Sequence, residues 1–285
     1  MIPRGMTTSI QIGLDGPEWR MATMGSRTQC GGWHVGNPRL QDRSALVTGG
    51  TGGIGRAVAQ AMAREGAHVV LSGRDAARGQ AVVERIREEG GRAQFVKGDL
   101  TDGAAVQRLA EDTAAALNGP VDILVNNAAV LPPAQSLFEA TEEQIDQVLA
   151  VNVKAPFLLT AAVVPGMIEQ GRGVVINMGS INGVLGMAVA ALYGASKAGL
   201  HSLTTSWAAE LGPKGVRVNT IAPGPTVTEL NEAIRPMLEK LTEADPAGRP
   251  ATADEVAAAA VFLASDEAAH IHGITLPVDG GALHR

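Results

Sequence analysis

The sequence predicts an α/β fold: one domain built on a doubly wound parallel sheet, with helices on both faces. Short, almost wholly apolar runs alternate with longer helical stretches from residue 43 onward, and the connections between them are short. Such runs are typical of parallel strands buried on both faces, and their alternation with helices is typical of βαβ units. A glycine-rich turn directly after the first run is a third indication.

Seven apolar runs are expected to form the strands of this sheet. In chain order they are Ala45–Val47, Val69–Leu71, Gln94–Val96, Ile123–Val125, Val174–Ile176, Val216–Ile221 and Ile274–Val278. The helices expected between them include Arg56–Glu65, Ala76–Glu89, Ala104–Leu117 and Glu142–Ile168. Gly66 and Gly90 follow two of these helices, where a left-handed glycine commonly ends a helix. Thr252 and Glu255 form a capping box before the apolar run Val256–Leu263.

Residues 1–42 differ from the rest of the chain. They contain scattered glycines, Trp19 and Trp33, and show no sustained period of 2 or 3.6. We expect a flexible extension, or residues upstream of the true start, because an aperiodic terminus is seldom tied down. The alternative is an arm that packs on a neighbouring subunit through its tryptophans.

Composition and charge narrow the possible partners. The 285 residues are 45% apolar and 18% charged, with a net charge of −6 and no block of basic residues. Nucleic acid and membrane surfaces are therefore not expected partners, and no apolar run approaches the ~20 residues of a membrane-spanning helix. The single cysteine, Cys30, cannot form an internal disulfide, which predicts a reducing, cytoplasmic location. The six histidines show no metal-ligand spacing, so no metal site is expected.

The only tyrosine of the chain, Tyr193, stands four positions before Lys197 and thirteen after Ser180. On a helix, positions i and i+4 share a face, so the phenol and the ammonium can meet in one site. A phenol ionises near pH ~10, and a neighbouring cation lowers its pKa toward the working range. The pair would then serve as a general acid for a carbonyl or a base for an alcohol. The same spacing also arises by chance on amphipathic helices, so its weight depends on context.

A nucleotide-binding turn is expected after the first strand, where Gly49, Gly53 and Gly55 lead into a helix. Glycines there allow a tight turn and close backbone approach to a pyrophosphate, which then faces the helix N-terminus. The second strand ends in Gly73, where an acid would hydrogen-bond a free ribose 2′-hydroxyl, and Arg74 follows. We therefore expect NADP(H), with NAD(H) as the alternative if Asp75 turns inward.

From about Arg43 to Arg285 the chain resembles the short-chain dehydrogenase/reductase family. The resemblance is carried by the glycine turn Thr48–Gly55, Gly98-Asp99-Leu100, Asn126-Asn127-Ala128-Ala129, the tyrosine motif, Pro223-Gly224 with Thr226 and Thr228, and Val278-Asp279-Gly280-Gly281. Ala129 replaces a family glycine and adds one methyl beside the cofactor, which we expect to be tolerated. The resemblance implies a Rossmann-type, NAD(P)-binding catalytic domain over residues 43–285 that acts on CH–OH groups.

The resemblance also implies site residues. Asn152, Ser180, Tyr193 and Lys197 match the family's catalytic tetrad. Tyr193 would give a proton to the forming alkoxide and Ser180 would hydrogen-bond the same oxygen. Lys197 would lower the tyrosine pKa and bind the nicotinamide ribose, and Asn152 would hold a water linking Lys197 to solvent. Taken alone, Asn152 is as well explained by hydrogen bonds to local backbone. The implied cofactor contacts are Gly49, Thr51, Gly53, Ile54, Gly55, Arg74, Asp99, Leu100, Asn126, Ala128, Tyr193, Lys197, Pro223, Gly224, Thr226 and Thr228.

The substrate is expected beyond the carboxyl ends of the strands. The loops there are apolar with a single amide: Val130, Leu131, Pro132, Ile181, Asn182, Val184, Leu185, Met187 and Leu230. Asn182, Met187 and Leu230 are our candidate substrate contacts. Such a pocket suits a small uncharged carbonyl, alcohol or sugar. The segment from Glu229 to Ala247 resembles the family's mobile lid, although a plain surface helix would have the same pattern.

Two alternative functions stay open. A 3-ketoacyl thioester reductase would need a basic surface beside the site for an acidic carrier protein, and Arg172, Lys214 and Arg217 offer some positive charge. A nucleotide-sensing or scaffold protein on the same fold is the non-enzyme alternative, which the complete tetrad disfavours. The helix of Tyr193 is rich in small residues and, in this family, such helices build subunit contacts; a homotetramer is expected, with a dimer second.

Overall fold

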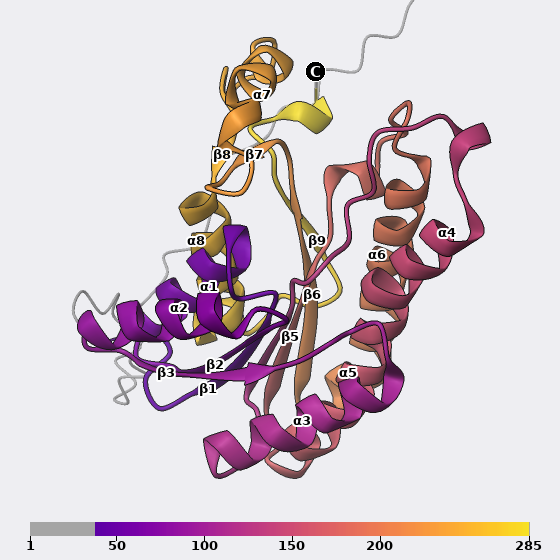
Figure 1. The fold of residues 1–285 in the computed structure, drawn as a ribbon. Coiled ribbons are helices and arrows are strands. Elements are labelled where there is room, and N and C mark those ends of the chain that lie inside the picture. The colour runs from indigo at the N-terminus through magenta and orange to yellow at the C-terminus, as the bar shows by residue number, and fades with distance from the viewer. Residues whose placement is uncertain (1–37, 285) are drawn as a thin grey trace, which may run out of the picture. The chain divides into compact units, whose positions relative to one another are not determined.

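Seven parallel strands form the central sheet, in the order β3-β2-β1-β4-β5-β6-β9 (Figure 1). Their bounds in the computed structural model are β1 Ser44–Thr48, β2 His68–Gly73, β3 Arg92–Lys97, β4 Ile123–Asn126, β5 Gly173–Met178, β6 Val216–Pro223 and β9 Thr275–Val278. Each contains the apolar run that predicted it, except that Ile274 precedes β9. The chain builds the sheet from β1 toward one edge and from β4 toward the other, so the predicted doubly wound α/β fold is confirmed.

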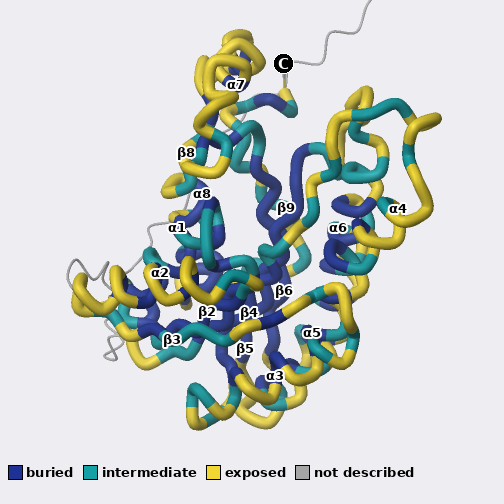
Figure 2. The backbone as a smooth tube through the Cα atoms, in the orientation of Figure 1, coloured by how far each residue is buried: buried dark blue, intermediate teal, exposed yellow. Residues whose placement is uncertain are grey.

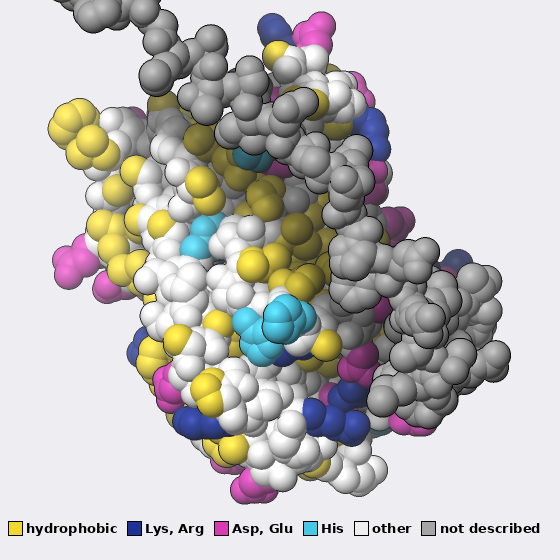
Figure 3. All heavy atoms as spheres, turned by 180° about the vertical axis from the view of Figure 1, so that it is seen from behind, with side chains coloured by type: hydrophobic (Ala, Val, Ile, Leu, Met, Phe, Trp, Pro, Cys, Tyr) yellow, Lys and Arg dark blue, Asp and Glu magenta, His cyan; other side chains and the backbone are white. Residues whose placement is uncertain are grey.

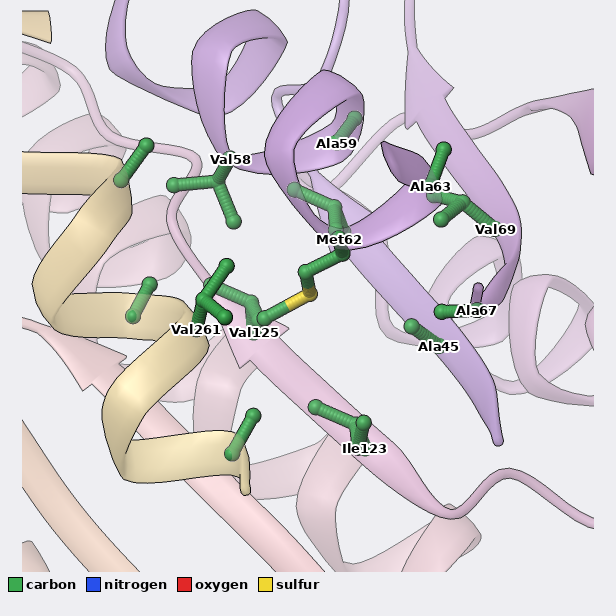
Figure 4. Packing of buried hydrophobic residues seen from close by; sticks show 14 of the residues in the cluster. Ala45, Val58, Ala59, Met62, Ala63, Ala67, Val69, Ile123, Val125 and Val261 are labelled. Carbon is green, nitrogen blue, oxygen red and sulfur yellow. The ribbon is translucent and has the colours of Figure 1, made fainter. Parts of the chain in front are cut away.

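Helices cover both faces of the sheet. The helices on one face are α1 Gly53–Arg64, α2 Ala76–Glu88 and α8 Ala253–Ala264, and those on the other are α3 Gly103–Leu117, α5 Ala155–Glu169 and α6 Ala191–Leu211 (Figure 1). Figure 4 shows Met62 of α1 extending between Val125 of β4 and Val261 of α8, and all three side chains are buried. Burying such a side chain contributes about 1.5–3 kcal/mol each, which fixes α1 on the sheet. Figure 2 shows the same division, with dark strands inside and exposed outer helix turns.

The structure describes residues 38–284, and the predictions for residues 1–37 lie outside them. Residues 38–42, which the sequence pattern placed in the extension, are packed on the domain. Leu40 is 1% exposed and its N–H donates to the carbonyl of Glu65 (2.8 Å). Arg39 pairs with the carboxylate of the same Glu65. The packed chain therefore begins upstream of Arg43.

The helix expected over Glu142–Ile168 consists of three parts. α4 (Glu142–Leu149) and α5 are joined without a break by a wide π-helical turn, Ala150–Lys154. By length and composition, the helical stretch Glu142–Glu169 could span a membrane, because an 18-residue segment of it has a mean hydropathy of 1.7, although no single apolar run is that long. Half of that 18-residue segment is buried in the protein, and α5 packs against α3, so core packing accounts for its apolar character.

The predicted helix ends are confirmed. Gly66 and Gly90 have φ of +90° and +83°, the left-handed conformation that glycine adopts without strain. Glu255 N–H donates to Thr252 Oγ1 (3.3 Å) and Thr252 N–H to Glu255 Oε2 (2.8 Å), which completes the capping box of α8. Outside the sheet, β7 Thr226–Val227 pairs with β8 Ala251–Thr252, and α7 Arg235–Thr242 lies within the expected lid; short 3₁₀ turns make up the other regular elements of the described residues.

Candidate active site

A cleft of about 540 Å³ lies at the carboxyl edge of the sheet, where the chain leaves β1 and β4 toward opposite sides. In doubly wound sheets this switch point is where ligands bind. It brings together these predicted residues: Gly49, Thr51, Gly53, Ile54, Gly55, Arg74, Asp99, Leu100, Ala128, Ser180, Tyr193, Lys197, Pro223, Gly224, Thr226, Thr228 and Leu230. Residues almost two hundred positions apart in the sequence thus line one cavity.

The glycine turn after β1 has no room for side chains. Gly49 and Gly53 have φ of +64° and +55°, and a Cβ on Gly55 would collide with the carbonyl oxygen of Gly49. A Cβ on Gly49 would come within 2.9 Å of the Asn127 amide nitrogen. The turn therefore presents bare backbone and the N-terminus of α1 to the cleft, the arrangement that binds a pyrophosphate.

Thr48 and Asn127 hold the turns after β1 and β4 together. The N–H groups of Asn127 and Ala128 donate to Thr48 Oγ1 (3.0 and 3.1 Å), and that hydroxyl donates to the carbonyl of Val125 (3.2 Å). Asn127 Nδ2 donates to the carbonyls of Thr48 (2.8 Å) and Gly49 (3.3 Å). The glycine turn is thus fixed by its neighbour before any ligand arrives.

Arg74, Asp75 and Asp99 mark the far end of the cleft, beyond β2 and β3. Asp75 is the N-cap of α2 and accepts from the N–H (3.0 Å) and Nε (2.8 Å) of Arg78, so its carboxylate is committed to that helix. Asp99 accepts from the N–H and hydroxyl of Thr101 (3.0 and 2.8 Å). These bonds, with the cations Arg74 and Lys97 nearby, hold the pKa of Asp99 below its usual value. Arg74 is exposed on the cleft wall.

Tyr193 and Lys197 lie one turn apart on α6, facing Ser180 at the end of β5. The Ser180 hydroxyl is close enough to the Tyr193 phenol to lower its pKa. Lys197 Nζ lies 5.6 Å from the centre of the tyrosine ring and donates to the carbonyl of Met178 (2.7 Å). The lysine is 2% exposed, a depth that sequence spacing alone does not predict.

The expected lowering of the tyrosine pKa is not found in this structure. Burial raises the pKa of Tyr193, and the hydrogen bond with Ser180 only partly opposes it. Burial also lowers the pKa of Lys197 to about 8, because its ammonium is removed from water without a carboxylate partner. Desolvation thus outweighs the attraction between the two groups.

Asn152 does not line the cleft. It sits in the π-helical turn, 1% exposed, and its Oδ1 accepts from the N–H of Val130 (2.8 Å). Its Nδ2 donates to the carbonyl of Val130 (3.0 Å) and to Ser196 Oγ (3.1 Å). Both amide protons of Asn152 are therefore used inside the protein.

Asn126 also differs from its expected place. Its side chain is 3% exposed and its Nδ2 donates to Thr160 Oγ1 (3.1 Å) and Asn177 Oδ1 (2.9 Å), below the cleft. Of the candidate substrate residues, Leu230 lines the cleft, whereas Asn182 and Met187 do not. Met187 is 44% exposed on the loop after β5, which carries it away from the wall.

Some cleft residues belong to motifs quoted from the sequence but were not among the expected contacts: Gly52, Gly73, Asp75, Gly98, Asn127 and Ala129. Others were not selected from the sequence: Ser72, Arg78, Thr101, Gln147, Val151, Met178, Gly179 and Asn231. Most are chain neighbours of selected motif residues. Gln147 lies on α4 and Val151 on the π-helical turn, four positions apart. Residues at this spacing share one face of a helix, and this spacing just before Asn152 was a signal that could have identified them.

His201 lies behind the serine loop, one turn after Lys197 on α6. The N–H of Ser180 points to its Nε2 (3.4 Å). A Cβ on Gly179 or Gly183 would collide with the imidazole, so these two glycines make room for the ring. Burial and the charge of Lys197 both lower the pKa of His201, which keeps it neutral and able to accept.

Comparison with known proteins gives consistent matches over the described domain. A family model described as enoyl-(acyl carrier protein) reductase matches residues 49–283. A D-threitol dehydrogenase of Mycolicibacterium smegmatis is 41% identical over 247 residues, 85% of this chain and 94% of the relative. A 3-oxoacyl-[acyl-carrier-protein] reductase of Vibrio cholerae is 38% identical over 244 residues, 85% and 98% of the two chains. A solved short-chain dehydrogenase of Burkholderia cenocepacia in complex with NADP has a TM-score of 0.79 and 37% identity, covering 86% of this chain and 99% of that one.

The buried lysine predicts a pH-dependent stability. Because the pKa of Lys197 falls from 10.5 to about 8 on folding, the unfolded chain binds more protons between these two values, and this contribution to the free energy of unfolding rises with pH there and is flat below about pH 8. We expect the ligand-free wild type to gain on the order of 3 kcal/mol over Lys197→Met across this window, measured by chemical denaturation. A difference between the two proteins that stays constant with pH would contradict the lowered pKa.

Proposed function

Since the chain belongs to the short-chain dehydrogenase/reductase family, and is thus an NAD(P)-dependent oxidoreductase acting on CH–OH groups, we propose that it uses NADP(H) to interconvert a small uncharged carbonyl compound and its secondary alcohol. The observation that carries the proposal is that the hydroxyls of Tyr193 and Ser180 and the glycine turn line one cleft. A group that can exchange a proton with oxygen is placed beside a nucleotide-binding backbone.

The described residues fit a dinucleotide. The glycine turn presents bare backbone where a Cβ would collide, and α1 begins there at Gly53, without a side-chain cap from Gly52. The turn and this N-terminus would hold the pyrophosphate, Asp99 and Leu100 the adenine, and Lys197 the nicotinamide ribose. When bound, the nicotinamide supplies or accepts the hydride.

The chain's own residues handle the proton. In the reducing direction, Tyr193 donates its hydroxyl proton to the substrate oxygen as charge develops there. Ser180 hydrogen-bonds the same oxygen and stabilises that charge. Its own hydroxyl is held by the N–H of Asn182 (3.2 Å) and its backbone by His201, so it is positioned in advance. Lys197, protonated below its pKa of about 8, stabilises the tyrosinate that remains.

The walls of the cleft support an uncharged substrate. The cleft's charged side chains are Lys197 beneath Tyr193 and the group beyond β2 and β3, whereas the β4 loop and α4 contribute Val130, Leu131, Gln147 and Val151. Among the described residues of the β4 loop and α4, no lysine or arginine lines the cleft, so these segments offer no cation to a substrate that carries a carboxylate or phosphate. A polyol or simple secondary alcohol suits this wall, and the D-threitol dehydrogenase relative acts on such a compound.

The thioester reductase alternative is less well supported, because the three cations expected to form a basic surface beside the site lie elsewhere. Arg172 precedes β5 and pairs with Asp122 (3.2 Å), and Lys214 precedes β6 and pairs with Glu210 (3.9 Å). Arg217 is 9% exposed and donates to two carbonyls near the end of α8. These positions lie at the amino ends of parallel strands, at the edge opposite the cleft, so they offer nothing to a carrier protein that would dock beside it.

We further propose NADP(H) as the preferred cofactor and a homotetramer as the assembly. Asp75, the carboxylate that would favour NAD(H), is committed to α2, which leaves the Arg74 cation to meet a 2′-phosphate.

Two exposed apolar faces support the assembly. Phe157 of α5 is 49% exposed, and its ring meets the ring of Trp207 of α6 edge-on, with 5.6 Å between the ring centres. A second face, seen from behind in Figure 3, gathers hydrophobic side chains at its centre. Two self-complementary surfaces are what a symmetric tetramer requires.

Tyr193→Phe tests the proton role. We expect kcat to fall by at least about 10²-fold, since general acid–base catalysis contributes that much, while the Kd for NADPH changes little. A panel of polyols, cyclic alcohols and ketones followed at the NADPH absorbance band measures the first, and calorimetry the second. Retained turnover would exclude Tyr193 as the acid.

Arg74→Glu tests the cofactor preference. A carboxylate would repel the 2′-phosphate, so kcat/KM with NADPH should fall by at least about tenfold while kcat/KM with NADH is kept or rises. Arg85→Glu is the matched control, because this arginine lies on α2, paired with Glu89 (2.8 Å), and does not line the cleft. An equal loss with both cofactors would remove Arg74 from the 2′-phosphate site.

Phe157→Glu tests the assembly. A charge buried in an α5–α6 contact between subunits is costly, so the sedimenting species should become smaller than a tetramer. Lys240→Glu on α7, far from α5 in Figure 1, serves as the control and should leave sedimentation unchanged. A Phe157→Glu protein that sediments as the wild type would refute this surface.

A further inference from the structure

A glutamate from the far end of the chain occupies the N-terminus of α1. Glu229 Oε1 accepts from the N–H of Gly53 (2.8 Å), the first residue of that helix. Its Oε2 accepts from Nη2 of Arg56, one turn further along (3.0 Å). Neither residue was selected from the sequence, because 173 positions separate the glutamate from the arginine.

Glu229 stands on a turn that is itself fixed. We call residues 226–231 the strap. Within it, Asn231 Oδ1 accepts from the N–H of Thr228 (2.7 Å), and Asn231 Nδ2 donates to the carbonyl of Thr226 (2.9 Å). Leu230 lies against the glycine turn, since a Cβ on Gly52 would be 3.2 Å from its Cδ1. The strap thus holds both a carboxylate and an apolar side chain over the site of the pyrophosphate.

The carboxylate supplies what α1 lacks. Gly52 stands at the N-cap and has no side chain to accept from the first N–H groups. Left alone, those donors and the positive end of the helix would face the cleft without a partner. Glu229 gives them an anionic oxygen, the same kind of group that a pyrophosphate would bring.

We propose that Glu229 takes the place of the cofactor's pyrophosphate in the empty enzyme, and that the dinucleotide displaces it on binding. The inference rests on the proposed function, which puts a pyrophosphate at this helix. Two anions cannot share the N–H of Gly53, so cofactor entry breaks the contacts of Glu229 with Gly53 and Arg56. The strap leads through a short turn into α7, so its release also frees the expected lid over the substrate side.

Glu229 competes with the cofactor from within the protein. The apparent affinity for the cofactor is therefore reduced in proportion to the fraction of molecules in which Glu229 occupies the site. Glu229→Gln keeps the side chain's shape but removes its charge, which weakens both the ion pair and the attraction to the helix end. We expect Glu229→Gln to bind NADPH roughly fivefold more tightly than the wild type, from the usual strength of such contacts. Glu229→Ala should act in the same direction.

Isothermal titration calorimetry with two ligands tests the displacement. NADPH carries the pyrophosphate, whereas adenosine 2′-monophosphate reaches only the Arg74 end of the cleft and should bind wild type and Glu229→Gln equally. Glu232→Gln is the matched control: it removes the same charge from the segment just after the strap, where Glu232 pairs with Arg235 (2.6 Å) and not with α1. It should leave both affinities unchanged.

Unchanged or weaker NADPH binding by Glu229→Gln, or an equal tightening of both ligands, would overturn the displacement. So would a Glu232→Gln protein that tightens NADPH as much, since the cause would then be general charge. If neither the wild type nor any variant binds NADPH or NADH, the proposed function itself fails, a result that calorimetry separates from the others.

Discussion

The hydrogen bonds between Thr48 and Asn127 are the constraint on which the site depends. They tie the glycine turn to the chain leaving β4, and that chain goes on to Val130, whose backbone is held by Asn152. Asn152 in turn reaches Ser196 on α6, and Ser196 Oγ donates to the carbonyl of Tyr193 (2.7 Å). A continuous series of hydrogen bonds thus connects the nucleotide-binding turn to the helix of the proposed acid. Asn152 acts in it as a positioning residue, which explains why it is buried and not in the cleft.

A second set of buried polar groups fixes α6 to the sheet. Asn126 of β4 bonds Asn177 of β5, and Asn177 Nδ2 donates to Thr204 Oγ1 of α6 (2.8 Å). Thr204 lies 2.6 Å from Thr220 Oγ1 of β6. Unpaired, such groups would each destabilise the core, but satisfied they select one placement of the helix. Asn126 therefore influences the cleft through α6, from a strand position that faces the core.

The fold was predictable because apolar runs report burial directly, and parallel strands buried on both faces leave few arrangements. The site was predictable where a motif is local: the glycine turn, and Tyr193 with Lys197 on one helix face. The site was not predictable where two neighbouring residues point to opposite sides of the sheet and the sequence does not show which residue faces the cleft. Asn126 points into the core and Asn127 to the cleft, and no pattern in the run of two asparagines tells them apart. The pKa of Tyr193 and the position of Glu229 depend on packing between remote segments, which only the folded chain defines.

Most charged groups of the cleft, and Glu229 of the strap beside it, have partners from their own chain. Glu229 is bonded to α1, Asp75 to α2, Asp99 to Thr101, and Lys197 to the carbonyl of Met178. Each bond is local in space and can be exchanged for a ligand group of the same polarity without leaving a donor or acceptor bare. Binding then largely replaces one partner by another in a preformed site. The entropy lost in ordering side chains on binding is therefore small, and the main rearrangement falls on the strap. Under the proposed displacement, the contact of Glu229 with α1 is given up only to a ligand that brings its own anion.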